Sequence, residues 1–253
     1  MCTIAGYNGT KPAAPILIDM MRRLEGFDSG FYTGIATFHE GKIYHAKVTG
    51  DLDRLLSETD AARLPGTMGF IHSRTPGKKG HDFKEVGHPF TTEMDGVTQT
   101  ALILNGTSGV FAPRTKGAMI PWVEKLESMG YTIKSRHPEA GNAALPDGTT
   151  MHSNDVRCQI VSSKIAAGKD LAFALQEMIS ETPVEAVYLI MSLAEPEAIC
   201  FARVCMPLHV GFCDHGAFMA TAPLAFIDRT NDYTLIPTMS YGKIFKNRFN
   251  ISI

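Results

Sequence analysis

The order of its strand-like and helix-like segments most constrains the fold of this chain. Strands come first, helices gather in the middle and strands return at the end, which predicts sheets packed together with helices outside. Residues 13–25 carry apolar side chains at helical spacing, whereas most other apolar runs are short and typical of strands. The expected strands are 2–7, 32–38, 42–48, 67–72, 98–104, 186–192, 197–204, 207–213, 216–220, 233–236 and 242–246, and the expected helices are 13–25, a short one from Asp51, 116–129, 155–167 and 170–180.

The connections between these segments also carry local signals. His39-Glu40-Gly41-Lys42 predicts a turn between two strands, and Asp170 is a candidate N-cap for the helix after it. Pro121 fits best in the first turn of the helix at 116–129. Residues 73–89 and 137–150 are rich in proline and glycine, so we expect loops there.

Composition favours an ordinary globular domain. Hydrophobic residues make up 44% of the 253 residues, which is enough for a substantial core. The 24 Lys and Arg residues nearly balance the 26 Asp and Glu residues, so a nucleic-acid-binding surface or an acidic tail is not indicated. The sequence has no low-complexity linker, no repeat and no abrupt change of composition. We therefore expect a single domain over residues 1–253.

The cysteines and the apolar runs indicate the compartment. The five cysteines are an odd number and form no CxxC, which favours reduced thiols in a cytoplasmic protein. The start of the chain lacks the basic and then apolar pattern of a signal peptide. No apolar stretch reaches the roughly 18 residues needed to cross a bilayer. We expect a cytoplasmic protein without a membrane or a nucleic acid as partner.

Cys2 directly follows the initiator methionine. A methionine before a small residue is normally removed, which would leave Cys2 with both a thiol and a free α-amine. The pKa of such an amine is about 8, so it can act as the general base for its own side chain. The β-prone run 3–7 would hold this terminus on a strand. The alternative is a buried structural cysteine, because a free cysteine often behaves as a small hydrophobic residue.

Asn105-Gly106 follows the apolar run 101–104 and has two interpretations. Asn-Gly is the strongest short signal for a tight hairpin turn. The functional alternative is an oxyanion hole, in which the Asn105 side-chain amide and the Gly106 backbone N–H point at a developing negative oxygen.

Arg74 and Asp155 are candidates for binding a charged ligand. Arg74 follows an expected strand and opens a loop, where its guanidinium could clamp a carboxylate or could simply be solvated. Asp155 precedes an expected helix, where it could pair with a ligand ammonium group or cap the helix.

Metal and phosphate sites are not indicated. His72, His81, His88 and His152 lack the spacing of a metal-binding motif, so we interpret them as loop or core histidines. Gly77-Lys78-Lys79-Gly80 lacks the frame of a phosphate-binding loop. We expect neither a metal nor a cofactor.

The order of these features resembles the class II glutamine amidotransferases, and most closely the glutaminase domain of the glucosamine-6-phosphate synthases. Each match is short, but the ordered set is specific and runs from Cys2 to about Lys243. The matching segments are Met1-Cys2-Thr3-Ile4-Ala5-Gly6-Tyr7, Leu24-Glu25-Gly26-Phe27-Asp28-Ser29, Gly69-Phe70-Ile71-His72-Ser73-Arg74, Gly87-His88-Pro89, Leu104-Asn105-Gly106, Asn154-Asp155-Val156 and Arg203-Val204-Cys205-Met206-Pro207-Leu208-His209-Val210-Gly211.

The resemblance implies an α+β fold of the N-terminal-nucleophile hydrolase type, a four-layer αββα sandwich. It also implies that the Cys2 thiolate attacks the side-chain amide of glutamine while the α-amine shuttles the proton. Asn105 and Gly106 would hold the oxyanion, Arg74 the substrate carboxylate and Asp155 its ammonium group. Ammonia would leave, and water would hydrolyse the γ-glutamyl thioester.

Several positions depart from the family pattern. Thr3 replaces the glycine after the nucleophile and adds bulk there. The family's loop start, Arg-Trp-Ala-Thr-His, is reduced to Arg74-Thr75-Pro76-Gly77, without the tryptophan and the histidine. Glu25 stands where the family has an arginine, and the glutamate of the family's Asp-Thr-Glu is Arg157 or absent. The substrate is therefore glutamine or another γ-glutamyl amide, and weak activity is a further alternative.

Three functional hypotheses follow from the resemblance. Full synthases of the family continue into a sugar-isomerase domain, and we expect no synthase or sugar-isomerase domain in this chain. The first hypothesis is a glutamine amidotransferase that passes ammonia to a separate synthase subunit. The second is a stand-alone hydrolase of other γ-glutamyl or linear amides. The third is a non-catalytic member that binds glutamine or a partner.

Overall fold

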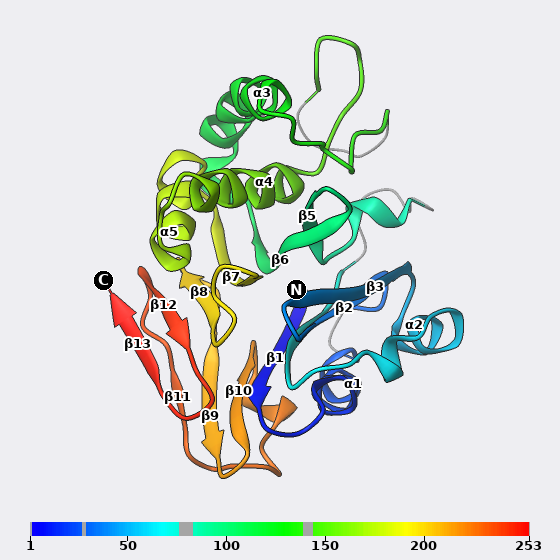
Figure 1. The fold of residues 1–253 in the computed structure, drawn as a ribbon, viewed down its shortest axis with the longest axis vertical. Coiled ribbons are helices and arrows are strands. Elements are labelled where there is room, and N and C mark those ends of the chain that lie inside the picture. Colours follow the sequence, from blue (N-terminus) through cyan, green and yellow to red (C-terminus); the bar gives the residue numbers. More distant parts are fainter. Residues whose placement is uncertain (1, 27–28, 76–82, 139–143, 253) are drawn as a thin grey trace.

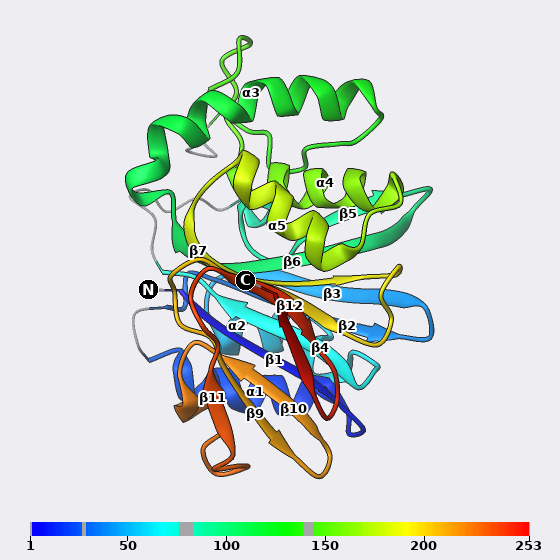
Figure 2. The same cartoon turned by 90° about the vertical axis from the view of Figure 1, so that its left-hand side faces the viewer.

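The computed structural model describes residues 2–26, 29–75, 83–138 and 144–252. Two antiparallel sheets pack face to face, and helices cover the outer face of each (Figure 1). The view in Figure 2 shows the resulting order of layers, with α3 to α5 on one side and α1 on the other. The α+β class and the four-layer αββα arrangement expected from the resemblance are confirmed.

The first sheet has seven strands in the order β11-β9-β10-β1-β4-β2-β3. Helices α1 (Ala13–Leu24) and α2 (Leu52–Glu58) cover its outer face. Its strands are β1 (Thr3–Gly9), β2 (Tyr32–His39), β3 (Lys42–Thr49), β4 (Met68–Ser73), β9 (His209–Cys213), β10 (Gly216–Ala220) and β11 (Tyr233–Leu235).

The second sheet has six strands in the order β13-β12-β8-β7-β6-β5. Helices α4 (Ser153–Ala166) and α5 (Leu171–Glu181) cover it, and α3 (Ala112–Ser128) packs on α4. Its strands are β5 (Phe90–Met94), β6 (Val97–Thr107), β7 (Glu185–Ser192), β8 (Ile199–Arg203), β12 (Ser240–Ile244) and β13 (Phe249–Ser252). Short 3₁₀ turns lie at Ala61–Arg63, Lys84–Val86, Gly109–Phe111 and Pro223–Ala225.

Side chains along the central strands point alternately to the two faces of a sheet, and they form three large apolar cores among the described residues. In β1, Ile4 belongs to the core between the two sheets, whereas Ala5 and Tyr7 belong to the core under α1. A third core lies between the second sheet and its helices. Because successive strand residues point to opposite faces, each central strand contributes to two cores at once.

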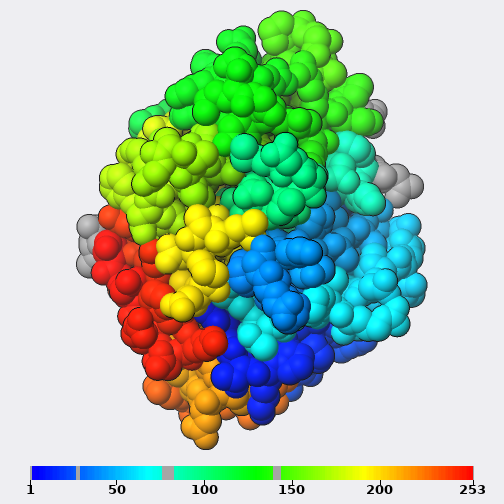
Figure 3. Space-filling model, in the orientation of Figure 1, coloured from blue at the N-terminus to red at the C-terminus, as the bar shows by residue number. Residues whose placement is uncertain are grey.

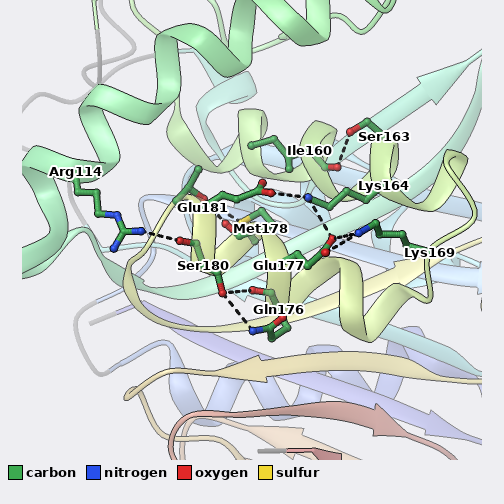
Figure 4. Close-up of polar contacts among 11 residues, drawn as sticks. Arg114, Ile160, Ser163, Lys164, Lys169, Gln176, Glu177, Met178, Ser180 and Glu181 are labelled. Atoms are coloured by element: carbon green, nitrogen blue, oxygen red, sulfur yellow. Dashed lines mark hydrogen bonds and ion pairs between the residues drawn. The ribbon is translucent and has the colours of Figure 1, made fainter.

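Helices α4 and α5 are also joined by surface ion pairs (Figure 4). Lys164 contacts Glu177 at 3.3 Å and Glu181 at 2.8 Å, and Lys169 contacts Glu177 at 2.6 Å. Arg114 of α3 donates to the Ser180 carbonyl at 3.2 Å. Such ion pairs add little net stability, because water screens the exposed ones and the mostly covered Lys164 loses hydration, so apolar packing holds the helical layer on the sheet.

The two sheets leave a hollow at the end of β1 that is distant from Cys2. It has a volume of about 370 Å³, and Asn8, His39 and Glu197 are among the residues that line it. On the face in Figure 3, the segment near residue 40 lies against the yellow segment near residue 195, although they are far apart in the sequence.

Most local expectations are confirmed. The Asp51 side chain accepts from the Arg54 N–H at 2.9 Å, and Asp170 caps α5 by accepting from Ala172 at 3.0 Å and Phe173 at 3.2 Å. Glu40 has φ 46° and Gly41 has φ 73°, so the expected turn between β2 and β3 is formed. No helix in the described ranges has both the length and the apolar character needed to span a bilayer.

Other expectations are wrong. Strands β5 and β13 were not expected, and α3 begins at Ala112 rather than at 116. Pro121 therefore lies inside the helix and not in its first turn, and α3 bends along its length in Figure 2. The expected loop at 73–89 includes a 3₁₀ turn, while its residues 76–82, with His81 and the Gly77–Gly80 stretch, lie outside the described residues.

Candidate active site

Strand pairing brings Cys2 and Arg74 to one end of the first sheet. Thr3 pairs with Ser73 across β1 and β4, and Cys2 and Arg74 are the adjoining residues at these strand ends. The Cys2 side chain is partly exposed, and its Sγ lies 3.7 Å from the Thr75 hydroxyl. The nucleophile and the arginine expected from the sequence therefore lie side by side.

Alternation directs the candidate side chains toward the space between the sheets. Cys2 lies two residues before Ile4 of β1, and Asn105 lies two residues after Ile103 of β6. Both isoleucines belong to the core between the sheets. Arg74 continues the inward-facing positions of β4. The core residues that fix this alternation are Ile4 in β1, Phe70 in β4 and Ile103 in β6.

The Arg74 side chain is held against β2 and the segment before β5. Its Nη1 donates to the Val86 carbonyl at 3.1 Å, and the guanidinium lies 5.2 Å from the centre of the Tyr32 ring. The backbone N–H of Arg74 donates to the Tyr32 carbonyl at 2.9 Å. These contacts give the guanidinium a fixed position and leave further N–H groups for a ligand.

Asn105 and Gly106 lie within β6, so the hairpin-turn interpretation is wrong. Asn105 pairs with Val187 and Gly106 with Ala186. The Asn105 side chain is 2% exposed, and its Nδ2 has no hydrogen-bond partner among the described residues. At Gly106, a Cβ would lie 2.3 Å from the Glu185 carbonyl oxygen, so only glycine fits there.

Asp155 is buried and is not the cap of its helix. His152 caps α4, since its Nδ1 accepts from the Asn154 N–H at 3.2 Å. The Asp155 carboxylate accepts from the Ser135 N–H at 2.7 Å and from the Gln159 amide at 3.1 Å. Burial raises the pKa of Asp155. Among the described residues, the hydrogen bonds of this carboxylate go to Ser135 and Gln159 and not to Cys2 or Arg74, so the structure does not bring Asp155 into direct contact with the other candidates.

Three buried histidines lie next to one another beside the candidate site. The ring centres of His72 and His88 are 4.0 Å apart, and those of His88 and His152 are 5.9 Å apart. Burial, together with the nearby charge of Arg74, lowers the pKa of His72 to about 3 and holds those of His88 and His152 well below their usual value. These three are core histidines, as expected. Within the described ranges, no group of three or more His, Cys, Asp or Glu side chains could hold a metal ion.

Glu25 stands where the family has an arginine, and its carboxylate has hydrogen-bond partners on three neighbouring elements. Its carboxylate accepts from the Ser73 hydroxyl at 2.8 Å, the Thr33 hydroxyl at 3.2 Å and the Leu52 N–H at 3.0 Å. It therefore joins the end of α1 to β4, to β2 and to the start of α2. The substitution itself was the only sequence signal for this role, because each partner is distant along the chain.

Arg157, the other charged departure, is also fully enclosed. It donates to the Asn154 side chain at 2.8 Å and to the Ser153 hydroxyl at 3.2 Å, within the first turns of α4. A further bond, of 3.2 Å, reaches the Thr182 carbonyl at the end of α5. Arg157 thus fastens the two helices together.

Comparisons of sequence point to one group of enzymes, although no family model matches the chain. The chain is 31% identical over 225 residues to the glutamine–fructose-6-phosphate aminotransferase (isomerizing) of Methanothermobacter thermautotrophicus, covering 87% of this chain and 32% of that protein. It is 25% identical over 253 residues to the enzyme of the same name from Pyrococcus horikoshii, covering 99% of this chain and 37% of that protein. The chain thus spans about a third of the length of these curated relatives.

Comparisons of structure extend over nearly the whole chain. The glutamine phosphoribosylpyrophosphate amidotransferase of B. subtilis matches with a TM-score of 0.70 at 17% identity, covering 99% of this chain and 49% of that chain. A glutamine aminotransferase class-II domain protein from Silicibacter pomeroyi matches with a TM-score of 0.61 at 13% identity, covering 99% of this chain and 98% of that chain. The chain therefore has the fold of the class II glutamine amidotransferases and is a sequence relative of the glutamine–fructose-6-phosphate aminotransferases.

Proposed function

We propose that this protein hydrolyses the side-chain amide of glutamine through Cys2 and releases ammonia. One observation carries the proposal. Cys2 directly before β1, Arg74 directly after β4 and Asn105 in β6 face the same end of the inter-sheet space, and the amide nitrogen of Asn105 has no partner among the described residues. A nucleophile, a carboxylate-binding cation and an unpaired donor are the groups that attack on an amino-acid amide requires.

The reaction begins at Cys2 once Met1 has been removed. The free α-amine takes the thiol proton, directly or through a water, and the thiolate attacks the amide carbon. The C–N bond then breaks and ammonia leaves with the proton that the α-amine returns. Water hydrolyses the γ-glutamyl thioester and restores the thiol. The Thr75 hydroxyl, 3.7 Å from Sγ, is placed to donate to the thiolate.

The negative oxygen of the tetrahedral intermediate is assigned to Asn105 and Gly106. Donors that are already in place when the charge develops stabilise the transition state more than the substrate. Asn105 is suited to this role because its buried Nδ2 has no competing partner in the described structure. The close approach of Gly106 to β7 fixes its backbone, so its N–H has one direction.

The charged ends of the substrate are assigned to Arg74 and Asp155. Among the described residues the Arg74 guanidinium donates to the Val86 carbonyl alone, so its other N–H groups can bind the α-carboxylate beside Cys2. Each carboxylate oxygen of Asp155 has two lone pairs, so its bonds to Ser135 and Gln159 leave acceptor capacity for an α-ammonium group. Because these residues are not in direct contact, the substrate would bridge them.

The acceptor of the released ammonia is a separate proposal. The names of the sequence relatives describe transfer to fructose 6-phosphate, and the matched region is about a third of those proteins. We propose that a synthase unit outside the four layers described above uses the ammonia, for example a separate subunit. Reconstitution with candidate synthases, scored by amination of a sugar phosphate at the expense of glutamine, tests this step.

A substrate series tests the proposed function. Ammonia release is measured with glutamine, with other γ-glutamyl amides and with simple linear amides that lack the amino-acid end. We expect turnover only where that end is present. Equal cleavage of simple amides would instead support a general amidohydrolase, and binding of glutamine without ammonia release would support a non-catalytic role.

A further inference from the structure

Two side chains of the first sheet donate to backbone carbonyls of the second sheet from opposite ends of the molecule. Asn8, at the distant end of β1, donates to the Ile244 carbonyl of β12 at 3.2 Å. His72, near the end of β4, contacts the Leu104 carbonyl of β6 through Nε2 at 3.0 Å. A carbonyl oxygen only accepts, so the His72 ring carries its proton on Nε2.

The bond of His72 lies between two groups of the proposed site. His72 is two residues before Arg74, and Leu104 directly precedes Asn105. The Leu104 carbonyl belongs to the peptide group that ends at the Asn105 nitrogen, and this group is planar. Holding the carbonyl oxygen therefore restrains the Asn105 Cα, from which the Asn105 side chain and the next peptide group, with the Gly106 N–H, project.

The surroundings of His72 keep its ring in place. Gly34 pairs with His72 across β2 and β4, and a Cβ at Gly34 would lie 2.1 Å from the His88 carbonyl oxygen. The His88 ring packs against the His72 ring, and neither ring is exposed beyond a few per cent. Arg74 and His88 are the charged and titratable neighbours, and burial keeps His72 neutral near pH 7. The basic atom of this ring is Nδ1, which has no partner among the described residues, and burial lowers the pKa of His72 so far that the ring is a poor general base.

We propose that His72 is a positioning residue for the reaction proposed above, because its Nε2–H holds the Leu104 carbonyl and so aims Asn105 and Gly106 at the oxyanion formed at Cys2. The inference rests on the proposed function. It assigns His72 no contact with the substrate. It also explains why a histidine occupies a fully buried position in β4, the strand directly before Arg74.

Three variants separate positioning from packing. His72→Phe keeps a ring and removes the donor, whereas His72→Gln supplies an amide donor of similar reach. Asn8→Leu is the matched control, because it removes the bonds of a first-sheet side chain to the Glu197 and Ile244 carbonyls at the end distant from Cys2. We expect kcat to fall roughly tenfold to a hundredfold in His72→Phe with KM for glutamine unchanged, since small displacements of catalytic groups have effects of this size. His72→Gln should recover most of kcat, and Asn8→Leu should lower only the unfolding temperature.

A pH profile and hydrogen exchange complete the test. The shape of the kcat profile between about pH 6 and pH 9 should be the same in His72→Gln as in the wild type, because a neutral donor does not titrate there. Amide exchange at residues 105–107 should become faster in His72→Phe and stay unchanged in Asn8→Leu.

The proposal is overturned if His72→Phe keeps the wild-type kcat and exchange rate. It is also overturned if His72→Gln is as inactive as His72→Phe and loses a limb of the pH profile, which would make His72 a proton-transfer residue. A wild-type protein that does not release ammonia would overturn the proposed function. The exchange rates would then still decide whether His72 holds the end of β6.

Discussion

Asn105 shows how a single buried side chain can carry information about function. A buried amide without a partner costs about 1–3 kcal/mol, so a strand that needed only stability would favour an apolar residue there. The neighbouring inward-facing residues of β6, Ala101 and Ile103, are apolar as expected. Among the described residues the Asn105 Nδ2 has no partner, which supports the oxyanion role proposed above.

Asn105→Ala should lower kcat by roughly a hundredfold to a thousandfold and leave KM for glutamine nearly unchanged. The reason is that the lost donor acts only on the transition state. Steady-state kinetics of ammonia release measure the effect, and thermal unfolding serves as the control. An effect confined to KM, or a variant that has simply lost its fold, would speak against an oxyanion role.

Arg74→Lys and Asp155→Asn should each raise KM for glutamine by about tenfold to more than a hundredfold, which corresponds to about 1.5–3 kcal/mol for one charge-assisted contact. Lysine cannot reproduce the planar fork that now binds the Val86 carbonyl and lies over Tyr32. Initial rates over a range of glutamine concentrations provide the measurement. Wild-type KM values in both variants would show that no head-group clamp exists.

The candidate residues differ in how far the sequence reveals them. Cys2, Arg74 and Asn105-Gly106 could be selected because each stands at a recognisable place, at the chain start or after an apolar strand. His72 and Glu25 could not, because their partners Leu104 and Ser73 are 32 and 48 positions away in the sequence. Only the pairing of strands places such residues together.

At the scale of elements, the end of β6 depends on a glycine. Gly106→Ala would place a Cβ 2.3 Å from the Glu185 carbonyl oxygen and 2.4 Å from the Ala186 Cβ, so β6 and β7 must separate there. We expect loss of glutaminase activity and a lower unfolding temperature. Gly117→Ala in α3 is the control, because nothing lies within 4 Å of its added Cβ. Removing a helical glycine should stabilise the protein by up to about 1 kcal/mol without changing kcat. A fully active Gly106→Ala variant would contradict the assignment.

The elements missed by the sequence patterns are short or follow misleading signals. Strand β5 has five residues directly after a segment rich in proline and glycine, and β13 has four near the end of the chain. Helix α3 begins before 116 because Pro113 lies in its first turn, where proline is tolerated. The assignment of Asn105-Gly106 to a turn failed because pairing with β7 continues through both residues.

At the scale of the whole molecule, the three buried histidines predict sensitivity to acid. In the unfolded chain each histidine has a pKa of about 6.5, whereas in the folded protein the pKa of His72 is lowered to about 3 and those of His88 and His152 lie well below 6.5. Below that value the unfolded chain takes up protons that the folded protein does not, so stability is lost as the pH falls.

The free energy of unfolding should therefore decrease between pH 7 and pH 5, by up to about 4 kcal/mol per pH unit for three histidines. Urea unfolding at a series of pH values measures this slope. His88→Gln should reduce the slope by up to about 1.4 kcal/mol per pH unit, the share of one histidine, whereas replacement of the half-exposed His39 by glutamine should leave it unchanged. A stability that is flat over this range would contradict the burial of neutral histidines.

The four-layer arrangement was predicted from the resemblance to the class II glutamine amidotransferases. The spacing of apolar residues alone did not predict it. Hydrophobic spacing located most strands, but it did not give their order. Strand β1 lies between β4 and β10, so one of its neighbours comes from the distant end of the chain. Such non-local pairing places Cys2 beside Arg74 at one end of the first sheet, and no local sequence signal specifies it.

The most direct test of the N-terminal nucleophile combines intact mass with ammonia release on the same sample. The wild-type protein should lack Met1 and release ammonia from glutamine, while Cys2→Ala should fold, lack Met1 and release none. Brief exposure of the wild type to glutamine followed by acid should add the mass of one γ-glutamyl group at Cys2. A fully active protein that retains Met1, or an active Cys2→Ala variant, would contradict the central claim.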